Sequence, residues 1–288
     1  MLTIRNLSKT YGNGIRALID VDLDIDRGMF GLLGPNGAGK STLMRTLATL
    51  QEPDTGTVRL GDLDVLEQKE EVRKILGYLP QEFGLYPRFS AEAMLNHFAV
   101  LKGIRDGGER KQTVEHILEI TNLSDVRKQK LGTFSGGMRQ RFGVAQALIG
   151  SPQLIIVDEP TAGLDPQERH RFLNLLSEIG ENVVVILSTH IVEDVRELCS
   201  RMAVIDKGRV LLSGDPRTFA SQLEGKVWRK SIEKDEVETY ENSMTVISKR
   251  LLAGRPNIHV FCEQPPGDGF EPVVPDLEDV YMAALRRA

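Results

Sequence analysis

Residues 34–42, GPNGAGKST, have the types and the spacing needed to bind a phosphate group. Glycine at positions 34, 37 and 39 permits backbone angles that a Cβ would block, so consecutive N–H groups can surround phosphate oxygens. Lys40 can reach the β- and γ-phosphates of a nucleoside triphosphate, and the Ser41 hydroxyl can ligate Mg²⁺. The stretch fits the P-loop pattern G-x-x-x-x-G-K-[ST]. We therefore expect nucleotide contacts from Gly34, Pro35, Asn36, Gly37, Ala38, Gly39, Lys40, Ser41 and Thr42.

Two acidic residues follow the apolar stretch LIIV of residues 154–157. Ligands of open α/β sheets bind at the carboxyl ends of the strands, so acids at this position usually face a site. Asp158 would complete the Mg²⁺ shell, and Glu159 would accept a proton from the attacking water, which contributes ~10²–10⁴-fold in rate. The alternative is a pair of solvated acids. The chain has no Asn-Lys-x-Asp stretch, which disfavours a GTPase.

A second phosphate-binding feature stands in TFSGGMRQR, residues 133–141. Ser135, Gly136 and Gly137 precede an apolar set at helical spacing, which ends at Gly150. The exposed N–H groups and the dipole of a helix N-terminus favour an anion. The apolar set consists of Met138, Phe142, Ala145, Leu148 and Ile149.

Four further residues have one chemical and one structural interpretation each. Tyr11 can stack on a base or cover a strand edge, and Gln81 can sense a ligand or bond within a loop. Asp165 precedes Pro166 in GLDPQE, which is typical of a helix N-cap with proline at the first helical position. His190 follows an apolar strand, where it can donate to a phosphate or be structural.

These residues require a parallel sheet to position them. Residues 29–33, 154–157 and 183–187 are apolar throughout, as strands buried on both faces are, and helical patterns lie between them. Residues 17–26 instead alternate, which predicts an antiparallel strand with one solvated face. Its apolar members are Leu18, Val21, Leu23 and Ile25, and its polar members are Asp20, Asp22, Asp24 and Asp26.

The remaining patterns predict a helical insertion and an appended region. Between residues 87 and 150 helical periodicity dominates, with Leu101 placed on an apolar face. A hairpin is expected over residues 204–212. The composition then shifts, so we expect an ATPase-type domain over residues 1–215 and a small α+β domain over 216–288, which ends in the helix LEDVYMAALRR. The fold class is α/β, with a P-loop, a parallel core and an N-terminal antiparallel subdomain.

Composition limits the function. The 288 residues carry a formal charge of −5, which gives no electrostatic basis for binding nucleic acid. The apolar runs are far shorter than the ~20 residues of a membrane span, and the N-terminus lacks the apolar core of a signal peptide. Cys199 and Cys262 do not make a disulfide framework, and no cluster has zinc spacing. We expect a cytoplasmic protein that meets a membrane only through partners.

The order of these motifs over about residues 1–215 resembles the ATP-binding cassette (ABC) ATPases. The resemblance implies ATP and Mg²⁺ as ligands, with Tyr11 stacked on adenine and Asp165 facing the site of a second cassette. Gln81 would sense the nucleotide and touch the membrane subunit, and His190 would contact the γ-phosphate. The catalytic set would be Glu159, His190 and Gln81, and the metal set Ser41, Gln81 and Asp158.

The resemblance also gives Ser135, Gly136 and Gly137 a role in trans. They would cap the ATP of a second cassette in a head-to-tail dimer, either a homodimer or a pair with a related cassette. Phe134 and Met138 depart from the usual Leu-Ser-Gly-Gly-Gln, and methionine lacks the amide hydrogen bonds of glutamine.

We therefore expect the ATPase subunit of an ABC exporter, peripheral to the inner face of the cell membrane, with separate transmembrane permease subunits as partners. Met after the two glycines and the terminal LEDVYMAAL resemble exporter subunits. One alternative is a soluble ABC ATPase that acts on ribosomes or nucleic acid. The other is a regulatory module that holds ATP without hydrolysing it, which intact Glu159 and His190 disfavour.

Overall fold

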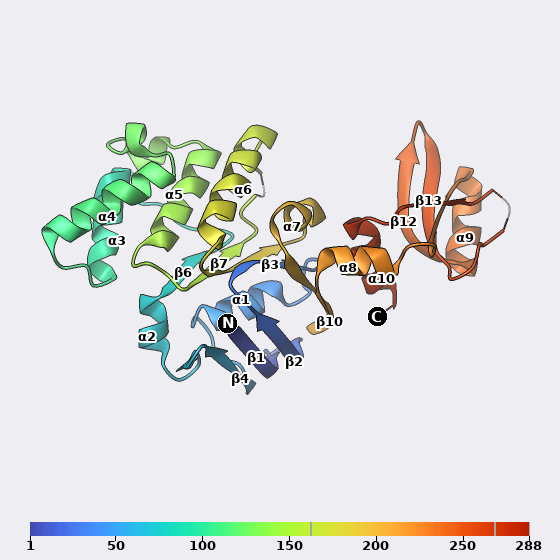
Figure 1. The fold of residues 1–288 in the computed structure, drawn as a ribbon, viewed down its shortest axis with the longest axis horizontal. Coiled ribbons are helices and arrows are strands. Elements are labelled where there is room, and N and C mark those ends of the chain that lie inside the picture. The colour runs from blue at the N-terminus through green and yellow to red at the C-terminus, as the bar shows by residue number, and fades with distance from the viewer. Residues whose placement is uncertain (162, 268, 288) are drawn as a thin grey trace.

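Three β-sheets organise the chain in the computed structural model, which describes residues 1–161, 163–267 and 269–287 (Figure 1). The central sheet has the order β10-β9-β3-β8-β7-β6, with all neighbours parallel except β10. Its strands are β3 (Gly28–Leu33), β6 (Leu76–Leu79), β7 (Leu154–Asp158), β8 (Val184–Thr189), β9 (Arg201–Asp206) and β10 (Arg209–Gly214). The predicted parallel core is confirmed, and the predicted hairpin is β9–β10.

Alternate residues of the central strands enter two separate cores. Phe30 and Ile186 pack on one side with helix α1 (Lys40–Leu47) and the N-terminal sheet. Met29 and Leu187 pack on the other side, together with α6 (Pro166–Gly180), α7 (Val192–Leu198) and the C-terminal α10 (Leu277–Arg287). Burial on both faces explains why residues 29–33 of β3, 154–157 of β7 and 184–187 of β8 are apolar throughout.

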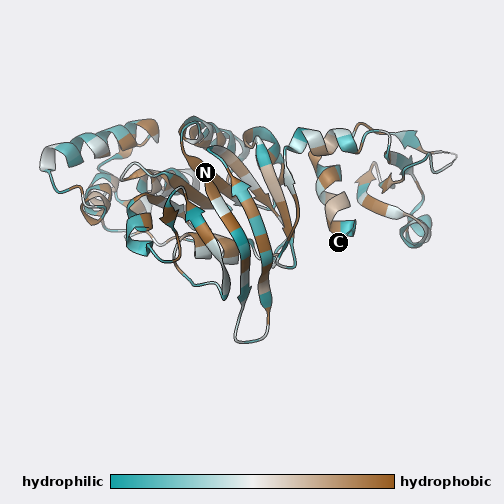
Figure 2. Ribbon diagram, turned by 60° about the horizontal axis from the view of Figure 1, so that its bottom comes forward, coloured by the Kyte–Doolittle hydropathy of each residue, from teal (hydrophilic) through white to brown (hydrophobic). Residues whose placement is uncertain are grey.

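The N-terminal sheet is antiparallel, in the order β2-β1-β4-β5, as the alternation predicted. Its strands show alternating hydropathy (Figure 2). The predicted strand slips at one point because Asp20 has a left-handed φ of 49°, and its N–H donates to the Ser8 hydroxyl. The strands are β1 (Leu2–Thr10), β2 (Arg16–Ile25), β4 (Thr55–Leu60) and β5 (Leu63–Asp64); the short helix α2 (Lys69–Lys74) leads to β6.

The insertion between β6 and β7 is helical, as predicted. Helices α3 (Ala91–Leu101), α4 (Gly107–Ile120) and α5 (Gly136–Leu148) enclose a core of their own. Two short 3₁₀ turns lie between α4 and α5. The placement of Leu101 on the apolar face was wrong, because this side chain is exposed at the end of α3.

The C-terminal region forms the third sheet, in the order β12-β13-β11-β14, and a small core. Helix α10 packs on the central core through Leu277 and Val280 and also contacts this sheet, since its Asp279 pairs with His259 at 2.8 Å. The elements are α8 (Pro216–Gln222), β11 (Val227–Ser231), a 3₁₀ turn (Lys234–Glu236), α9 (Val237–Ser243), β12 (Thr245–Leu252), β13 (Arg255–Phe261) and β14 (Glu271–Pro272). A domain boundary at residue 215 stays a prediction.

Among the described residues, no helix combines the length and the apolar composition that a bilayer crossing requires.

Candidate active site

The loop between β3 and α1 has the backbone that its glycines allow. Gly39 precedes α1 with a left-handed φ of 109°, and a Cβ there would lie 2.3 Å from the Ala17 carbonyl oxygen. A Cβ at Gly34 would lie 2.4 Å from the Ile205 carbonyl oxygen. No side chain caps the first turn of α1, so its N–H groups stay available to an anion.

Lys40 is buried beneath this loop. Its ammonium donates to the carbonyl oxygens of Gly34 at 2.6 Å and Pro35 at 3.1 Å, and it lies 3.9 Å from a carboxylate oxygen of Glu159. Burial lowers the pKa of Lys40, and the charges of Glu159 and Asp158 oppose that shift. The loop therefore already holds the cation that a terminal phosphate would need.

Glu159 follows β7 and contacts side chains from the ends of the two neighbouring strands. Gln81, after β6, donates its amide to one carboxylate oxygen at 3.0 Å. The Nδ1 atom of His190, after β8, lies 3.3 Å from the other oxygen. The Glu159 N–H donates to the Ser188 carbonyl, and its φ of 48° turns the chain away from β7. The three residues predicted as catalytic thus lie in one cluster.

Asp158 lies beneath this cluster, buried at the end of β7. Burial raises the pKa of Asp158, while the hydroxyl groups of Ser188 and Ser41 lower it. Its Oδ1 atom is buried without a hydrogen bond of ordinary geometry among the described residues. A buried carboxylate oxygen beside a serine hydroxyl fits the oxygen ligands of Mg²⁺.

A cleft of about 620 Å³ joins the loop to Tyr11. The Tyr11 hydroxyl contacts Thr42 Oγ1 at 3.1 Å and donates to Gln51 at 3.2 Å, so the ring lies at the end of the P-loop. His190 and Asp158 do not line the cleft. His190 contacts the lining residue Glu159, and Asp158 lies beside the lining residue Ser41. The lining residues are Tyr11, Ile15, Arg16, Ala17, Asn36, Gly37, Ala38, Gly39, Lys40, Ser41, Thr42, Gln81, Glu159 and Lys207.

Sequence reasoning missed Ile15, Arg16, Ala17 and Lys207. Lys207 stands in the β9–β10 turn, which packs on the P-loop because the Gly208 N–H donates to the Ala38 carbonyl. A Lys-Gly turn is an ordinary hairpin signal. Nothing in the local sequence indicates that this turn lies against a distant loop.

Ser135 and Asp165 lie outside this cleft, and each caps a helix. Helix α5 starts where the sequence predicted, and the Ser135 hydroxyl accepts the Met138 N–H at 3.2 Å there. The Asp165 carboxylate accepts the Glu168 N–H at 2.9 Å at the start of α6, which confirms its N-cap interpretation. Gly136 and Gly137 form the first turn of α5 and do not line the cleft either.

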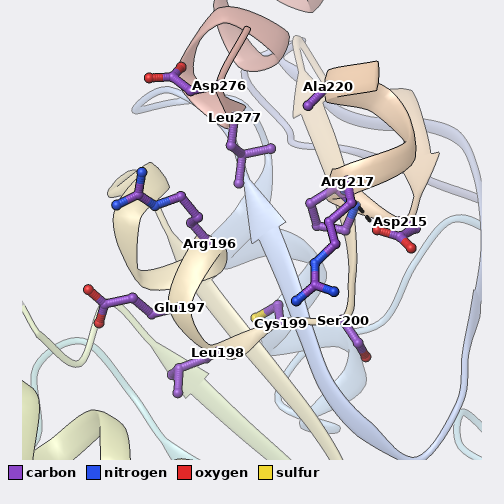
Figure 3. A pocket seen from close by; sticks show the side chains of 11 residues that line it. Arg196, Glu197, Leu198, Cys199, Ser200, Asp215, Arg217, Ala220, Asp276 and Leu277 are labelled. Atoms are coloured by element: carbon purple, nitrogen blue, oxygen red, sulfur yellow. Dashed lines mark hydrogen bonds between the residues drawn. The ribbon is translucent and has the colours of Figure 1, made fainter. Parts of the chain in front are cut away.

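A second cleft, of about 480 Å³, contains none of the predicted site residues. It lies between the end of α7, the start of α8 and the start of α10 (Figure 3). Arg196 and Arg217 project from its two sides, and Cys199 lies at its base. Burial raises the pKa of the Cys199 thiol, with a smaller effect from Asp194, so the thiol stays protonated and unreactive.

Comparison with known proteins agrees with this geometry. Residues 18–162 match the ABC transporter family. The chain is 35% identical over 228 residues to the linearmycin resistance ATP-binding protein LnrL of Bacillus subtilis (strain 168), covering 78% of this chain and 72% of the relative. It is also 35% identical over 268 residues to the Nod factor export ATP-binding protein I of Cupriavidus pinatubonensis, covering 92% and 81%.

Solved structures show the same fold. One is a dimeric structure of a post-hydrolysis state of the ATP-binding cassette MJ0796 bound to ADP and Pi, with a TM-score of 0.67 and 28% identity. It covers 75% of this chain and 98% of that one. An ATP-binding subunit of an ABC transporter gives a TM-score of 0.69 with 29% identity, covering 77% and 92%. With a P-loop, an acid pair at the end of β7 and these relatives, the chain belongs to the ABC transporter family as an ATP-binding subunit with ATPase activity.

Proposed function

We propose that the chain supplies ATP hydrolysis to an exporter whose membrane-spanning subunits are separate proteins. The cluster of Gln81, Glu159 and His190 around the P-loop carries the hydrolysis proposal. The export proposal is supported by relatives named for linearmycin resistance and Nod factor export. The soluble alternative is not favoured, since these relatives and neighbours are transporter subunits and cassettes.

In this proposal the P-loop binds the phosphates, and the acid pair Asp158 and Glu159 serves metal binding and proton transfer. The backbone N–H groups of the loop and Lys40 bind the β- and γ-phosphates, and Tyr11 stacks on the base. Ser41, Gln81 and Asp158 would hold Mg²⁺, which neutralises charge on the phosphate oxygens. Glu159 takes the proton of the attacking water, and His190 donates a hydrogen bond to the γ-phosphate.

We further propose that Ser135, Gly136 and Gly137 act on the ATP of a second cassette. Their position outside the chain's own cleft supports a role in trans. The first turn of α5 presents N–H groups to an anion, and Asp165 precedes the neighbouring α6. The related cassette MJ0796 is itself dimeric. Closure of two copies would exclude water other than the nucleophile.

The segment after Gln81 supports contact with a membrane subunit. Tyr86 and Phe89 are 60% and 54% exposed, and their rings meet edge to face with centroids 6.2 Å apart. Exposed aromatic pairs are typical of interface anchors. We propose that this pair meets the permease, which would place the chain on the inner face of the membrane, where ATP is available.

Glu159→Gln is the substitution that tests the proposal. We expect steady-state ATPase activity to fall by roughly 10²–10⁴-fold because the general base is lost. ATP should then accumulate in an unhydrolysed dimer, measured as solution mass with and without ATP. Ser135→Arg in the same background should abolish the mass increase while leaving ATP binding intact.

Two results would count against parts of this proposal. Wild-type turnover in Glu159→Gln would remove Glu159 as the base. An unchanged mass with full ATP binding would remove the homodimer and leave a related cassette or the permease to set the association.

A further inference from the structure

Asp194 is a fully buried carboxylate on α7 that belongs to none of the nucleotide motifs. It does not line the nucleotide cleft. Burying an unpaired charge in such a position is strongly destabilising, so a buried carboxylate needs hydrogen-bond partners. These partners show which segments Asp194 connects. Both of its oxygens have partners, and neither partner comes from α7.

The first partner is Thr161, whose hydroxyl donates to Oδ2 at 2.6 Å. Thr161 is itself buried and lies two residues after Glu159. Its carbonyl accepts the N–H of Leu164, the residue before Asp165, at 3.2 Å. Asp194 therefore holds the beginning of the segment that carries Asp165.

The second partner is Arg169 of α6. Its Nε–H donates to Oδ1 at 2.8 Å, and its Nη2 lies 2.7 Å from the same oxygen as an ion-pair contact. The Arg169 N–H donates to the Asp165 carbonyl at 2.9 Å, in the first turn of α6. Asp194 therefore also holds the far end of the segment, so both ends of residues 161–169 are tied to α7.

Helix α7 begins two residues after His190, at Val192. Ile191 precedes its first turn, and the Ile191 N–H donates to the Thr189 hydroxyl at 3.0 Å. Because His190 lies between Thr189 and Ile191, a shift of α7 displaces the backbone that carries it. The hydrogen bond from Arg169 to Asp194 is charged, and such bonds are stronger than neutral ones and fix geometry as well.

We propose that Asp194 is a positioning residue that couples the segment carrying Asp165 to the helix that follows His190. When a second cassette contacts Asp165, the displacement passes through Thr161 and Arg169 to α7, and so to His190 beside Glu159. The inference rests on the proposed roles of these residues. The coupling is a continuous set of hydrogen bonds between three elements, the kind of physical network along which two sites influence one another.

Thr161→Val and Thr161→Ser form the matched pair that tests it. Valine has nearly the shape of threonine but removes the donor to Asp194, whereas serine keeps the hydroxyl. In the full chain with ATP and Mg²⁺, we expect Thr161→Val to lower kcat about tenfold with an unchanged KM, since ground-state binding is untouched. Thr161→Ser should stay within about twofold of wild type. Asp194→Asn should match Thr161→Val or exceed it.

If Asp194 and Thr161 only stabilise the fold, kcat should fall only in proportion to the fraction of folded protein. The melting temperature and the stoichiometry of ATP binding in the Glu159→Gln background give the folded, binding-competent fraction of each variant. The proposal is overturned if Thr161→Val keeps its kcat, loses kcat only in proportion to that fraction, or changes KM alone. Wild-type turnover in Glu159→Gln would instead overturn the proposed base, a result independent of the serine–valine comparison.

Discussion

The proposed chemistry of the site depends on the Glu159 carboxylate, which already has three side-chain contacts in the empty protein. Glu159 contacts Gln81, His190 and Lys40, and its backbone has a left-handed φ of 48°, which a non-glycine residue adopts only when its surroundings enforce it. The bond from the Glu159 N–H to the Ser188 carbonyl supplies part of that enforcement. Glu159, the proposed general base, is thus positioned before ATP arrives, which reduces the reorganisation needed for catalysis.

Asp158 is a buried carboxylate in the proposed Mg²⁺ site, and its burial in the empty protein is expected to lower stability. Asp158→Asn should raise the melting temperature of the nucleotide-free, Mg²⁺-free protein at about pH 8, and the gain should shrink as the pH falls through the raised folded-state pKa towards about pH 4. Burial raises the pKa of Asp158, so the cost of the ionised carboxylate is full above the folded-state pKa and vanishes below the unfolded-state value. Each 1 kcal/mol corresponds to roughly 2–4 °C in domains of 150–250 residues. ATPase activity should be lost.

The exposed Asp62 supplies the control for this measurement. Asp62→Asn should leave the melting temperature unchanged within about 1 °C at both pH values, as surface substitutions usually do. A lower melting temperature of Asp158→Asn at both pH values would show that the carboxylate stabilises the empty protein.

At the scale of elements, the start of α5 packs against the start of α6. Glycine at position 137 suits this arrangement, because a Cβ there would lie 2.2 Å from a carboxylate oxygen of Glu168 and would force that side chain to shift out of its ion pairs. Glu168 is also paired with Arg171 at 2.9 Å and lies 3.8 Å from Arg141, so it is not free to move away. The two helices that would face a second cassette thus form one unit.

Gly137→Ala should therefore destabilise the monomer, while Gly136→Ala should not. Nothing lies within 4 Å of a Cβ at Gly136, so alanine there should add about 0.5–1 kcal/mol from its helix preference. At Gly137 the clash should outweigh that gain by about 1–3 kcal/mol. Urea denaturation without ATP measures both, and Gly137→Ala with Glu168→Ala should recover most of the loss. Equal stability of the two alanine variants would contradict the packing.

At the scale of the whole molecule, α10 joins the C-terminal sheet to the ATPase core. Leu277, Val280 and Tyr281 are buried with residues of β9 and α7. On its other side α10 meets the sheet through the Asp279–His259 pair and a contact between Glu278 and Arg250. Since α7 also carries Asp194, the C-terminal region lies one helix away from the catalytic cluster.

Leu277→Ala should lower the free energy of unfolding of the whole chain by about 2–5 kcal/mol, because it leaves a cavity in the shared core. Leu252→Ala, at a site that is 58% exposed compared with 4% for Leu277, should change it by less than about 0.5 kcal/mol. Calorimetry with and without ATP should show one transition that shifts in Leu277→Ala. A shift confined to a separate, ATP-insensitive transition would show that the C-terminal region unfolds independently.

The sequence by itself determined the local chemistry and the class of fold. Apolar runs, the P-loop glycines, the helix start at Ser135 and the cap at Asp165 encode their structures over a few neighbouring residues, and each was found where the pattern predicted it. Periodicity failed at Leu101, where a helix end extends past the core it packs on.

Only the tertiary structure decided which distant residues meet. The order of strands in the central sheet brings Gln81, Glu159 and His190 to one edge, and hairpin packing adds Lys207 to the cleft. The burial of Asp194 and the docking of α10 likewise depend on faces that meet only after folding. Short-range spacing specifies an element, whereas contacts between elements depend on the topology that burial of their apolar faces selects.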